Sequence, residues 1–517
     1  MSTSQLFEGQ VLRDCIQCGF CLEACTTYRQ TFEEGLSPRG RIMLLRTLTG
    51  QAGEDGDHDQ AIEAWRLLDL CLFCRACEVA CPSGVRYGSL ITEVRDRLPR
   101  PPGESPPRLL RFSLRSIFPR PRLLALTLRA VRCVGCSPLA RLIVRVLFPK
   151  AHRPHFLHLL SSVRRASGKD RSAEGSVLEK QRKWLRAQEE RSDAAGAESM
   201  VPLLDVGDPV LIFRGCVTPV IFPGVLSAWY SLLDKMGVVY STPKGQTCCG
   251  ALHQQYGELK QARALARRNI AAFEATGSGF ILVESAGCGA ALKGYGDLLA
   301  DDPLYAESAR RFSARVRDVS EILAERGGAS PAEQGNDEGA APADQGNDEG
   351  PAPAEQGNDE GPAPADQGND EGPAPTGQGN DEGPAPADQS VDLPRVVYQE
   401  PCQLRHVQQV AECPRTILDH LPGLERVPTP EADLCCGAAG IYALLQPAMA
   451  ASLGDRKAEQ LVSTGAELVV TTDPGCRIQL DGRLASRGVE MRHLLEVCDA
   501  LWPAKGSRKN GKLFLRE

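Results

Sequence analysis

The sequence lacks the features that mark membrane-spanning and secreted proteins. It contains no run of eighteen or more apolar residues, the length that a spanning helix requires. The first residues, Met1 to Asp14, lack the charged, apolar and small-residue regions of a signal peptide. We therefore expect the protein to stay in the cytoplasm.

Motifs for nucleotide, flavin and acyl-transfer sites are also missing. No convincing Gly-x-Gly-x-x-Gly, Walker or nucleophile-elbow motif occurs, so we expect no catalytic residue and no flavin on this chain. The net charge of -7 is mild for 517 residues and averages a basic and an acidic stretch. We expect no nucleic-acid partner.

Cysteine, by contrast, is abundant. The chain has 20 cysteines, many of them in tight clusters. In a reducing compartment, clustered cysteines are typical of metal or cluster ligation rather than of disulfides. A chain of 517 residues is long enough for two to four domains, each with its own core.

The N-terminal part divides into two segments. Residues 1–98 hold two dense cysteine runs and show helix-like apolar spacing at Gly40 to Gly50 and at Ile62 to Leu70. Proline-rich residues Pro99 to Pro107 mark a boundary, and residues 99–205 form a basic connector without acids from Arg108 to Lys169. Its amphipathic pattern predicts helices that could dock on an anionic membrane surface or an acidic partner. The alternative is a solvated helical connector that packs on neighbouring domains.

Strands and helices alternate in the remaining chain. In residues 206–326 and 393–517 a related order of elements recurs, which indicates an internal duplication. We expect strands at Val210 to Phe213, Val238 to Tyr240, Phe280 to Val283, Arg395 to Tyr398 and Leu468 to Thr471, and helices at Val225 to Met236, Leu259 to Ala275 and Ile441 to Leu461. Between the halves, residues 327–392 repeat Gln-Gly-Asn-Asp-Glu-Gly every eleven residues, which predicts a disordered acidic linker.

The two N-terminal cysteine runs have the spacing of bacterial two-cluster ferredoxins. They read Cys-x2-Cys-x2-Cys-x3-Cys, the second followed by Pro82 and the first by Thr26. In that pattern the fourth cysteine of each run serves the other cluster. The predicted ligands of two [4Fe-4S] clusters are Cys15, Cys18, Cys21 and Cys81 for one and Cys71, Cys74, Cys77 and Cys25 for the other. The alternative is a pair of zinc sites, which also use four cysteines.

A second cysteine pattern occurs once in each half. It comprises Cys216, Cys248, Cys249 and Cys288 in the first half and Cys402, Cys435, Cys436 and Cys476 in the second, at offsets of 186 to 188 residues. Each set, or a site shared between the halves, could hold one or two further clusters; the alternative is buried thiols or a redox-active pair. His253 could lie near the first site but is expected to be structural. We also expect Cys133, Cys136, Cys413 and Cys498 to be structural.

These residues resemble known families. The pattern around Cys248-Cys249-Gly250 is similar to the cysteine-rich CCG domain of heterodisulfide reductase, although Ala291 and Gln479 replace the last cysteine of each motif there. Longer stretches, among them Ser37-Pro-Arg-Gly-Arg41 and Tyr398-Gln-Glu-Pro-Cys402, resemble the iron-sulfur subunit of bacterial glycolate oxidase. The expected fold is therefore multidomain: an α-helical two-cluster ferredoxin-like domain followed by duplicated α/β cysteine-rich domains.

The resemblance implies the function of an electron-transfer subunit. Partner subunits would carry FAD and oxidise glycolate to glyoxylate, and this chain would pass electrons to a membrane quinone or a similar acceptor rather than to NAD or oxygen. The protein could then be peripheral on the inner face of the cell membrane. The alternatives are an iron-sulfur subunit of a D-lactate or glycerol-3-phosphate dehydrogenase, a heterodisulfide-reductase-like subunit and, outside this class, a zinc-stapled scaffold.

Overall fold

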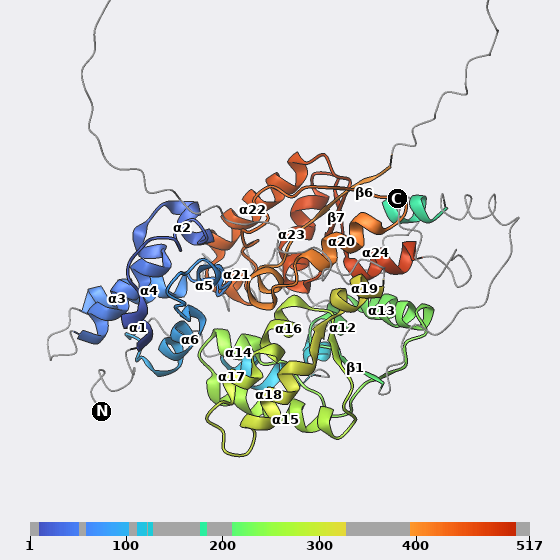
Figure 1. The fold of residues 1–517 in the computed structure, drawn as a ribbon. Helices are drawn as coiled ribbons and strands as arrows, with labels where there is room; N and C mark the ends of the chain where they lie inside the picture. The colour runs from blue at the N-terminus through green and yellow to red at the C-terminus, as the bar shows by residue number, and fades with distance from the viewer. Residues whose placement is uncertain are drawn as a thin grey trace, which may run out of the picture. The chain divides into compact units, whose positions relative to one another are not determined.

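The computed structural model describes residues 10–50, 58–102, 111–120, 123–127, 176–183, 209–326 and 393–502 (Figure 1). These residues all belong to one compact unit. The predicted acidic linker, Cys133, Cys136 and most of the basic connector lie outside the described residues. None of the helices in the described ranges combines the length and apolar composition of a membrane span.

The N-terminal region is helical, as predicted (Figure 1). Its apolar core contains Ile42 and Leu45 from one long helix, Trp65 and Leu68 from the next, and Ile91 from the last. Both predicted helices exist and begin earlier than the apolar spacing suggested. The elements are α1 (Gln10–Asp14), α2 (Thr26–Thr31), η2 (Glu34–Leu36), α3 (Pro38–Gly50), α4 (His58–Asp69), α5 (Ala76–Val79) and α6 (Tyr87–Arg97).

Each half of the remaining chain contains a four-stranded parallel sheet. The strands β1 (Val210–Phe213), β2 (Tyr240–Ser241), β3 (Ile281–Val283) and β4 (Val316–Asp318) pair in the order β2-β1-β3-β4. The strands β5 (Arg395–Tyr398), β6 (Glu425–Val427), β7 (Leu468–Thr471) and β8 (Glu490–His493) pair in the order β6-β5-β7-β8. The same connectivity thus occurs twice, in agreement with the predicted duplication.

Helices connect these strands and cover the sheets (Figure 1). In the first half they are α12 (Thr218–Ile221), α13 (Pro223–Lys235), α14 (Ala251–Gln255), α15 (Leu259–Glu274), α16 (Ala286–Lys293), α17 (Tyr295–Leu298), α18 (Ala306–Arg315) and α19 (Val319–Arg326). In the second half they are η6 (Gln403–Gln408), α20 (Glu412–His420), α21 (Tyr442–Leu445), α22 (Pro447–Ser463), α23 (Pro474–Ala485) and α24 (Leu494–Leu501).

The structure corrects parts of the predicted secondary structure. The predicted helix from Ile441 to Leu461 is two helices, α21 and α22, because Pro447 has no N–H to continue the first one. The strands β4, β6 and β8 were not predicted. Each is three or four residues long and includes charged residues, so its apolar pattern is weak.

The two halves share one apolar core. Trp229 of α13 and Leu495 of α24 belong to the same buried cluster as Val210 of the first sheet and Val470 of the second. The helices α13 and α24 pack side by side, as do α19 and α20. Burial of this joint apolar surface holds the two sheets in one arrangement, which positions the cysteines that follow their strands.

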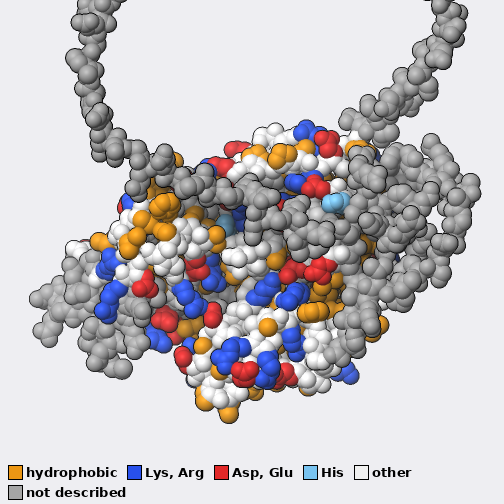
Figure 2. Space-filling view, viewed as in Figure 1, with side chains coloured by type: hydrophobic (Ala, Val, Ile, Leu, Met, Phe, Trp, Pro, Cys, Tyr) orange, Lys and Arg blue, Asp and Glu red, His pale blue; other side chains and the backbone are white. Residues whose placement is uncertain are grey.

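Residues 111–120 and 123–127 of the basic connector pack on the first half, whereas Val177 donates its N–H to Glu490 of the second half at 3.2 Å. Leu114 in η3 (Ser113–Ile117) is buried, and Leu124 lies in the same core cluster as Phe213. Arg115 forms an ion pair with Glu258 at 2.8 Å. Phe112 and Leu126 of the same segment are exposed, so both predicted alternatives for the connector stay predictions. On the face shown in Figure 2, basic and acidic side chains are interspersed over the halves.

Candidate iron-sulfur sites

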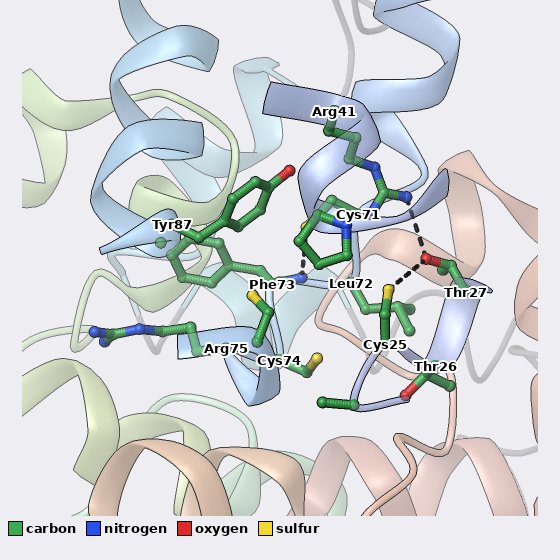
Figure 3. A pocket seen from close by; sticks show the side chains of 14 residues that line it. Cys25, Thr26, Thr27, Arg41, Cys71, Leu72, Phe73, Cys74, Arg75 and Tyr87 are labelled. Carbon is green, nitrogen blue, oxygen red and sulfur yellow. Dashed lines mark hydrogen bonds between the residues drawn. The ribbon is translucent and has the colours of Figure 1, made fainter. Parts of the chain in front are cut away.

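Two small pockets in the helical region bring the eight N-terminal cysteines together. One is lined by Cys25 together with the three thiols of the second run, Cys71, Cys74 and Cys77 (Figure 3). The other is lined by Cys15, Cys18, Cys21, Cys77 and Cys81. The fourth cysteine of each run therefore lies at the pocket of the other run. The predicted assignment of these residues to two cubanes stays a prediction, and this arrangement fits it.

The two cysteine loops turn in the same unusual way. Gln17 and Gly19 in the first loop, and Phe73 and Arg75 in the second, have φ between 58° and 89°. A left-handed residue directly before and after the middle cysteine wraps each loop around a point, so that its thiols face inward. Three of these four positions carry side chains that are sterically strained there. Such strain is typical of ligand sites.

Polar hydrogens point at several of these sulfur atoms. The backbone N–H of Phe73 donates to Cys71 Sγ at 3.4 Å, and that of Val85 donates to Cys81 Sγ at 3.4 Å. Hydrogen bonds to sulfur stabilise thiolates and are a main control of cluster potential.

Three of these thiols are costly to ionise without a bound cation. Burial raises the pKa of Cys21 to about 11 and the pKa values of Cys74 and Cys77 well above their usual range. Coordination to iron removes this cost because a metal-bound thiol is deprotonated. The donor set of soft, inward-facing thiols therefore fits an iron-sulfur cluster.

A buried arginine stands beside the Cys25 pocket. Arg41 donates to the Leu67 carbonyl at 2.9 Å and to Thr27 Oγ1 at 3.2 Å, and this hydroxyl lies 3.3 Å from Cys25 Sγ (Figure 3). Burial opposes the charge of the Arg41 guanidinium, yet nearby Tyr87 and cysteine sulfur raise the pKa of Arg41. Gly40 is required before it, because a Cβ there would collide with the Glu34 carbonyl. The motif Ser37-Pro-Arg-Gly-Arg41 thus places a permanent cation at this site.

The eight cysteines of the duplicated halves line one cavity. Its volume is about 380 Å³, and its wall includes Cys216, Cys248, Cys249, Cys288, Cys402, Cys435, Cys436 and Cys476. Within the first half, Sγ atoms lie 3.9 Å apart for Cys216 and Cys248 and 3.4 Å apart for Cys249 and Cys288. The equivalent distances in the second half are 3.8 Å and 3.2 Å. Each half thus gathers its own four thiols, and both sets face the same cavity.

The duplicated fold explains this gathering. Cys216 and Cys402 follow the carboxyl ends of the central strands β1 and β5, and Cys288 and Cys476 lie in the first turns of α16 and α23. Carboxyl ends of parallel strands and helix N-termini meet at one edge of an α/β sheet. The N-terminal dipole of a helix there favours a thiolate.

One carboxylate joins the two halves at this edge. Asp473 caps α23 by accepting from Gly475 N at 2.8 Å and also accepts from Gly287 N in α16 at 3.0 Å. The positions of the missing last cysteines, Ala291 and Gln479, both line the cavity, and Gln479 Nε2 is committed to the Ala450 carbonyl.

His253 lies in α14, four residues after Cys249, and contacts the connector. It is fully buried, and its Nε2 lies 2.8 Å from the Leu114 carbonyl oxygen of the connector. Burial opposes protonation, but the Cys248 thiol raises the pKa of the ring above its ordinary value. The sequence contains only a weak signal that His253 would lie here, because a lone histidine four residues after a cysteine has many explanations.

The Cys25 pocket also touches the second half. The backbone N–H of Cys435 donates to Thr26 Oγ1 at 3.1 Å, and Gln403 Nε2 donates to the Phe73 carbonyl at 2.8 Å. Thr26 follows Cys25 and Phe73 precedes Cys74 in the chain, so both residues adjoin cysteines of this pocket. Their partners in the second half are Cys435 itself and Gln403, the residue after Cys402. Cys402 also raises the pKa of Cys74, after burial the largest cause. The sequence shows Thr26 where the ferredoxin pattern has proline, but its contact with Cys435 was not predicted.

The remaining described cysteines lie away from these sites. Cys413 and Cys498 are buried in the core that the halves share. Burial raises the pKa of Cys413 to about 12, so it stays a neutral thiol. Within the described ranges, no three Cys, His, Asp or Glu side chains are arranged to hold a single metal ion.

Comparison with known protein families agrees with this layout. The family described as "4Fe-4S dicluster domain" matches residues 11–85, and the family described as "Cysteine-rich domain" matches residues 210–293 and again 396–481. The second match confirms the predicted duplication.

Two relatives match nearly the whole chain, and a third matches 56% of it. The probable glycolate oxidase iron-sulfur subunit of Bacillus subtilis is 29% identical over 513 residues, covering 97% of this chain and 95% of the relative. The glycolate oxidase iron-sulfur subunit of Escherichia coli is 29% identical over 498 residues, covering 95% and 94%. Lactate utilization protein A of Geobacillus thermodenitrificans is 24% identical over 291 residues, covering 56% of this chain and 97% of the relative. The chain therefore matches a 4Fe-4S dicluster domain once and a cysteine-rich domain twice, and it is similar over nearly its full length to glycolate oxidase iron-sulfur subunits.

Proposed function

We propose that this protein is the iron-sulfur electron-transfer subunit of a flavin-dependent glycolate dehydrogenase. The observation that carries the proposal is the continuous series of thiol sites, from the two N-terminal pockets to the eight-cysteine cavity. A bound [4Fe-4S] cluster supplies one-electron chemistry, which a two-electron flavin on a partner needs in order to discharge.

The chain's own residues support this role in three ways. Cys77 lines both N-terminal pockets, so the two sites are adjacent. Thr26 and Gln403 connect the Cys25 pocket to the second half by hydrogen bonds. Arg41 places positive charge where reduction would add negative charge.

The substrate and the acceptor rest on the relatives. Both near full-length relatives are named glycolate oxidase subunits, which favours glycolate over D-lactate. The shorter relative named for lactate utilization keeps D-lactate as the second candidate. FAD on the partner subunits, a quinone acceptor and peripheral attachment to the membrane are part of the same proposal.

The first test is anaerobic purification followed by iron, sulfide and zinc analysis and EPR of the dithionite-reduced chain. About eight irons per chain support two N-terminal cubanes, and about four or more further irons support sites in the halves. Zinc without iron and without a reducible signal overturns the proposal in favour of a scaffold.

The second test addresses the substrate. The chain is co-expressed with the flavin subunits of its own host, and the purified complex is mixed with glycolate or D-lactate and an artificial electron acceptor. Faster acceptor reduction with glycolate supports the proposal, and activity with D-lactate alone replaces glycolate by D-lactate.

A further inference from the structure

The duplication allows the two cysteine sites to be compared position by position. Gly250 and Gly437 follow the adjacent cysteines of each half, and a Cβ on them would meet Ala262 in α15 and Ala450 in α22. These two alanines are 188 residues apart, so α15 and α22 are counterparts that pack behind the cysteine pairs. The same offset matches Asn269 in the first half with Lys457 in the second.

The first half has a neutral side chain at this position. Asn269 is fully buried, and its Oδ1 accepts from Thr247 N at 2.7 Å. Its Nδ2 donates to the Cys248 carbonyl at 3.1 Å and to the Tyr295 hydroxyl at 2.9 Å. Asn269 thus holds the backbone of the cysteine pair without adding charge.

The second half has a lysine in the same place. Lys457 is only 2% exposed, and its Nζ donates to the Glu431 carbonyl at 2.7 Å. Glu431 is in turn fixed by ion pairs with Arg29 at 2.8 Å and Arg456 at 2.6 Å. The lysine is therefore anchored beside the loop that leads into Cys435 and Cys436.

Electrostatics couple this lysine to the thiols. Burial lowers the pKa of Lys457, and Cys436 is the group that opposes this most strongly, ahead of Asp433 and Cys435.

From this geometry we infer that Lys457 is a positioning residue that raises the reduction potential of a cluster held by the second half. One-electron reduction adds one negative charge to the site and makes or breaks no bond. A cation in a buried, low-dielectric environment stabilises the reduced state more than the oxidised one. The neutral Asn269 provides no such effect in the first half, so the duplicated sites differ in potential. The inference rests on the proposed function, because it needs a cluster in the second half.

His253 gives the first half a different polar neighbour. Its counterpart at the 187-residue offset of the adjacent cysteine pairs is Gly440, so the second half has no imidazole there. Because the protonation of a histidine depends on pH, the reduction potentials of the two sites must be compared at one fixed pH.

The test is a redox titration of the full anaerobic chain with dithionite as the reductant, followed by EPR. A Cys249→Ser background removes a ligand of the first half and isolates the signal of the second. Lys457→Gln keeps a donor for the Glu431 carbonyl and removes the charge, whereas Lys457→Arg keeps the charge. Arg487→Gln removes one charge from the same half at a partly exposed residue that pairs with Glu459.

We expect Lys457→Gln to make reduction of the second-half site at least tenfold less favourable, a shift of about 59 mV for one electron. Lys457→Arg and Arg487→Gln should stay near the parent potential, and the N-terminal clusters should not shift in any variant. If Lys457→Gln keeps its iron content and its reduction potential is unchanged, the inference about Lys457 is wrong, while the proposed function stands.

Two further outcomes also count against it. If Lys457→Gln and Lys457→Met both lose the iron of the second half, the lysine has a structural role and the inference is wrong. If the parent chain holds iron only in its N-terminal clusters, the role of Lys457 falls together with the proposed sites in the halves, while the electron-transfer role of the N-terminal region stands.

Discussion

The N-terminal helical region and the two sheet-containing halves gather thiols over very different lengths of chain. In the helical region three cysteines of each pocket come from one loop of seven residues, for example Cys71 to Cys77. In the first half, Cys216, Cys248 and Cys288 span more than seventy residues and follow different strands. The first kind of site depends on local backbone turns and the second on the assembled sheet.

This difference predicts different sensitivities. Local loops with left-handed residues at Gln17 and Phe73 can keep their thiols together as long as the loop is intact. The cavity of the halves requires the shared core, including Trp229 and Leu495, and the link through Asp473. Damage to the interface between the halves should therefore affect the cavity before it affects the N-terminal pockets.

The largest effect is expected from the crossed cysteines of the helical region. Cys25→Ser should remove the cluster of the Cys71 loop, and Cys81→Ser should remove that of the Cys15 loop, each with about four irons. Iron analysis and EPR measure this loss. Cys413→Ser is the control, because that thiol lies in the core away from both pockets. If Cys25→Ser loses the EPR signal that Cys18→Ser removes, instead of the signal that Cys74→Ser removes, the ligands are not crossed.

The next effect separates two sites in the cavity from one shared site. Because each half holds its four thiols within its own fold, Cys249→Ser should remove iron from the first half only and Cys436→Ser from the second only. The double variant should lose the sum of the two, about eight irons if each half holds a cubane. Equal iron in the single and double variants would mean one site that both halves share.

A smaller effect concerns pH and the buried carboxyls behind the cavity. Burial raises the pKa of Glu284 from 4.5 to about 7 and that of Asp318 from 3.8 to about 6. The folded state thus keeps protons that the unfolded chain releases, so stability is fully present below about pH 4.5 and is lost as the pH rises to about 7.

Glu284→Gln should remove this loss and stabilise the protein by about 3 kcal/mol at pH 8, with little change near pH 4.5. Anaerobic urea unfolding of both proteins at pH 5.5 and pH 8 measures the difference, which should be larger at pH 8. Asp297→Asn is the control, because that carboxylate is exposed and paired with Arg86. If the free energy of unfolding of the parent, relative to that of Glu284→Gln, is higher at pH 8 than at pH 5.5, the raised pKa of Glu284 is contradicted.

The smallest effect concerns the contact between the two kinds of site. Thr26→Val leaves the buried N–H of Cys435 without its acceptor, which should cost about 2 kcal/mol. Thr26→Ser keeps the hydroxyl and should cost less. The thermal unfolding midpoint of the anaerobic protein measures both variants, and equal midpoints for valine and serine would mean that the hydrogen bond contributes nothing.

Much of the architecture was readable from local patterns. The strands Val210–Phe213, Arg395–Tyr398 and Leu468–Thr471 were predicted with the bounds that the structure has, because each is a continuous, largely buried apolar run. The duplication followed from near-constant cysteine offsets, and the family matches confirm it. The short strands at 316–318 and 425–427 were missed because their charged residues hide the apolar pattern.

Only the grouping of the cysteines was predictable for the site. Cysteine spacing indicated which thiols would lie together, and their assignment to clusters stays a prediction. The spacing could not show that Thr26 would contact Cys435, or that Arg41 would reach Thr27 from another helix. Both contacts join separate elements of the fold, and neither spacing nor apolar periodicity in the sequence indicates which elements will pack together.

By itself, then, the sequence determined the grouping of the cysteines, the helical and α/β regions and their duplication, because these depend on local spacing and apolar periodicity. Only the tertiary structure decided that the eight cysteines of the halves line one cavity, and that the second half contacts the Cys25 pocket. It also placed a cation, Lys457, behind one cysteine pair and an amide, Asn269, behind the other, because the surroundings of both side chains depend on how α15 and α22 pack.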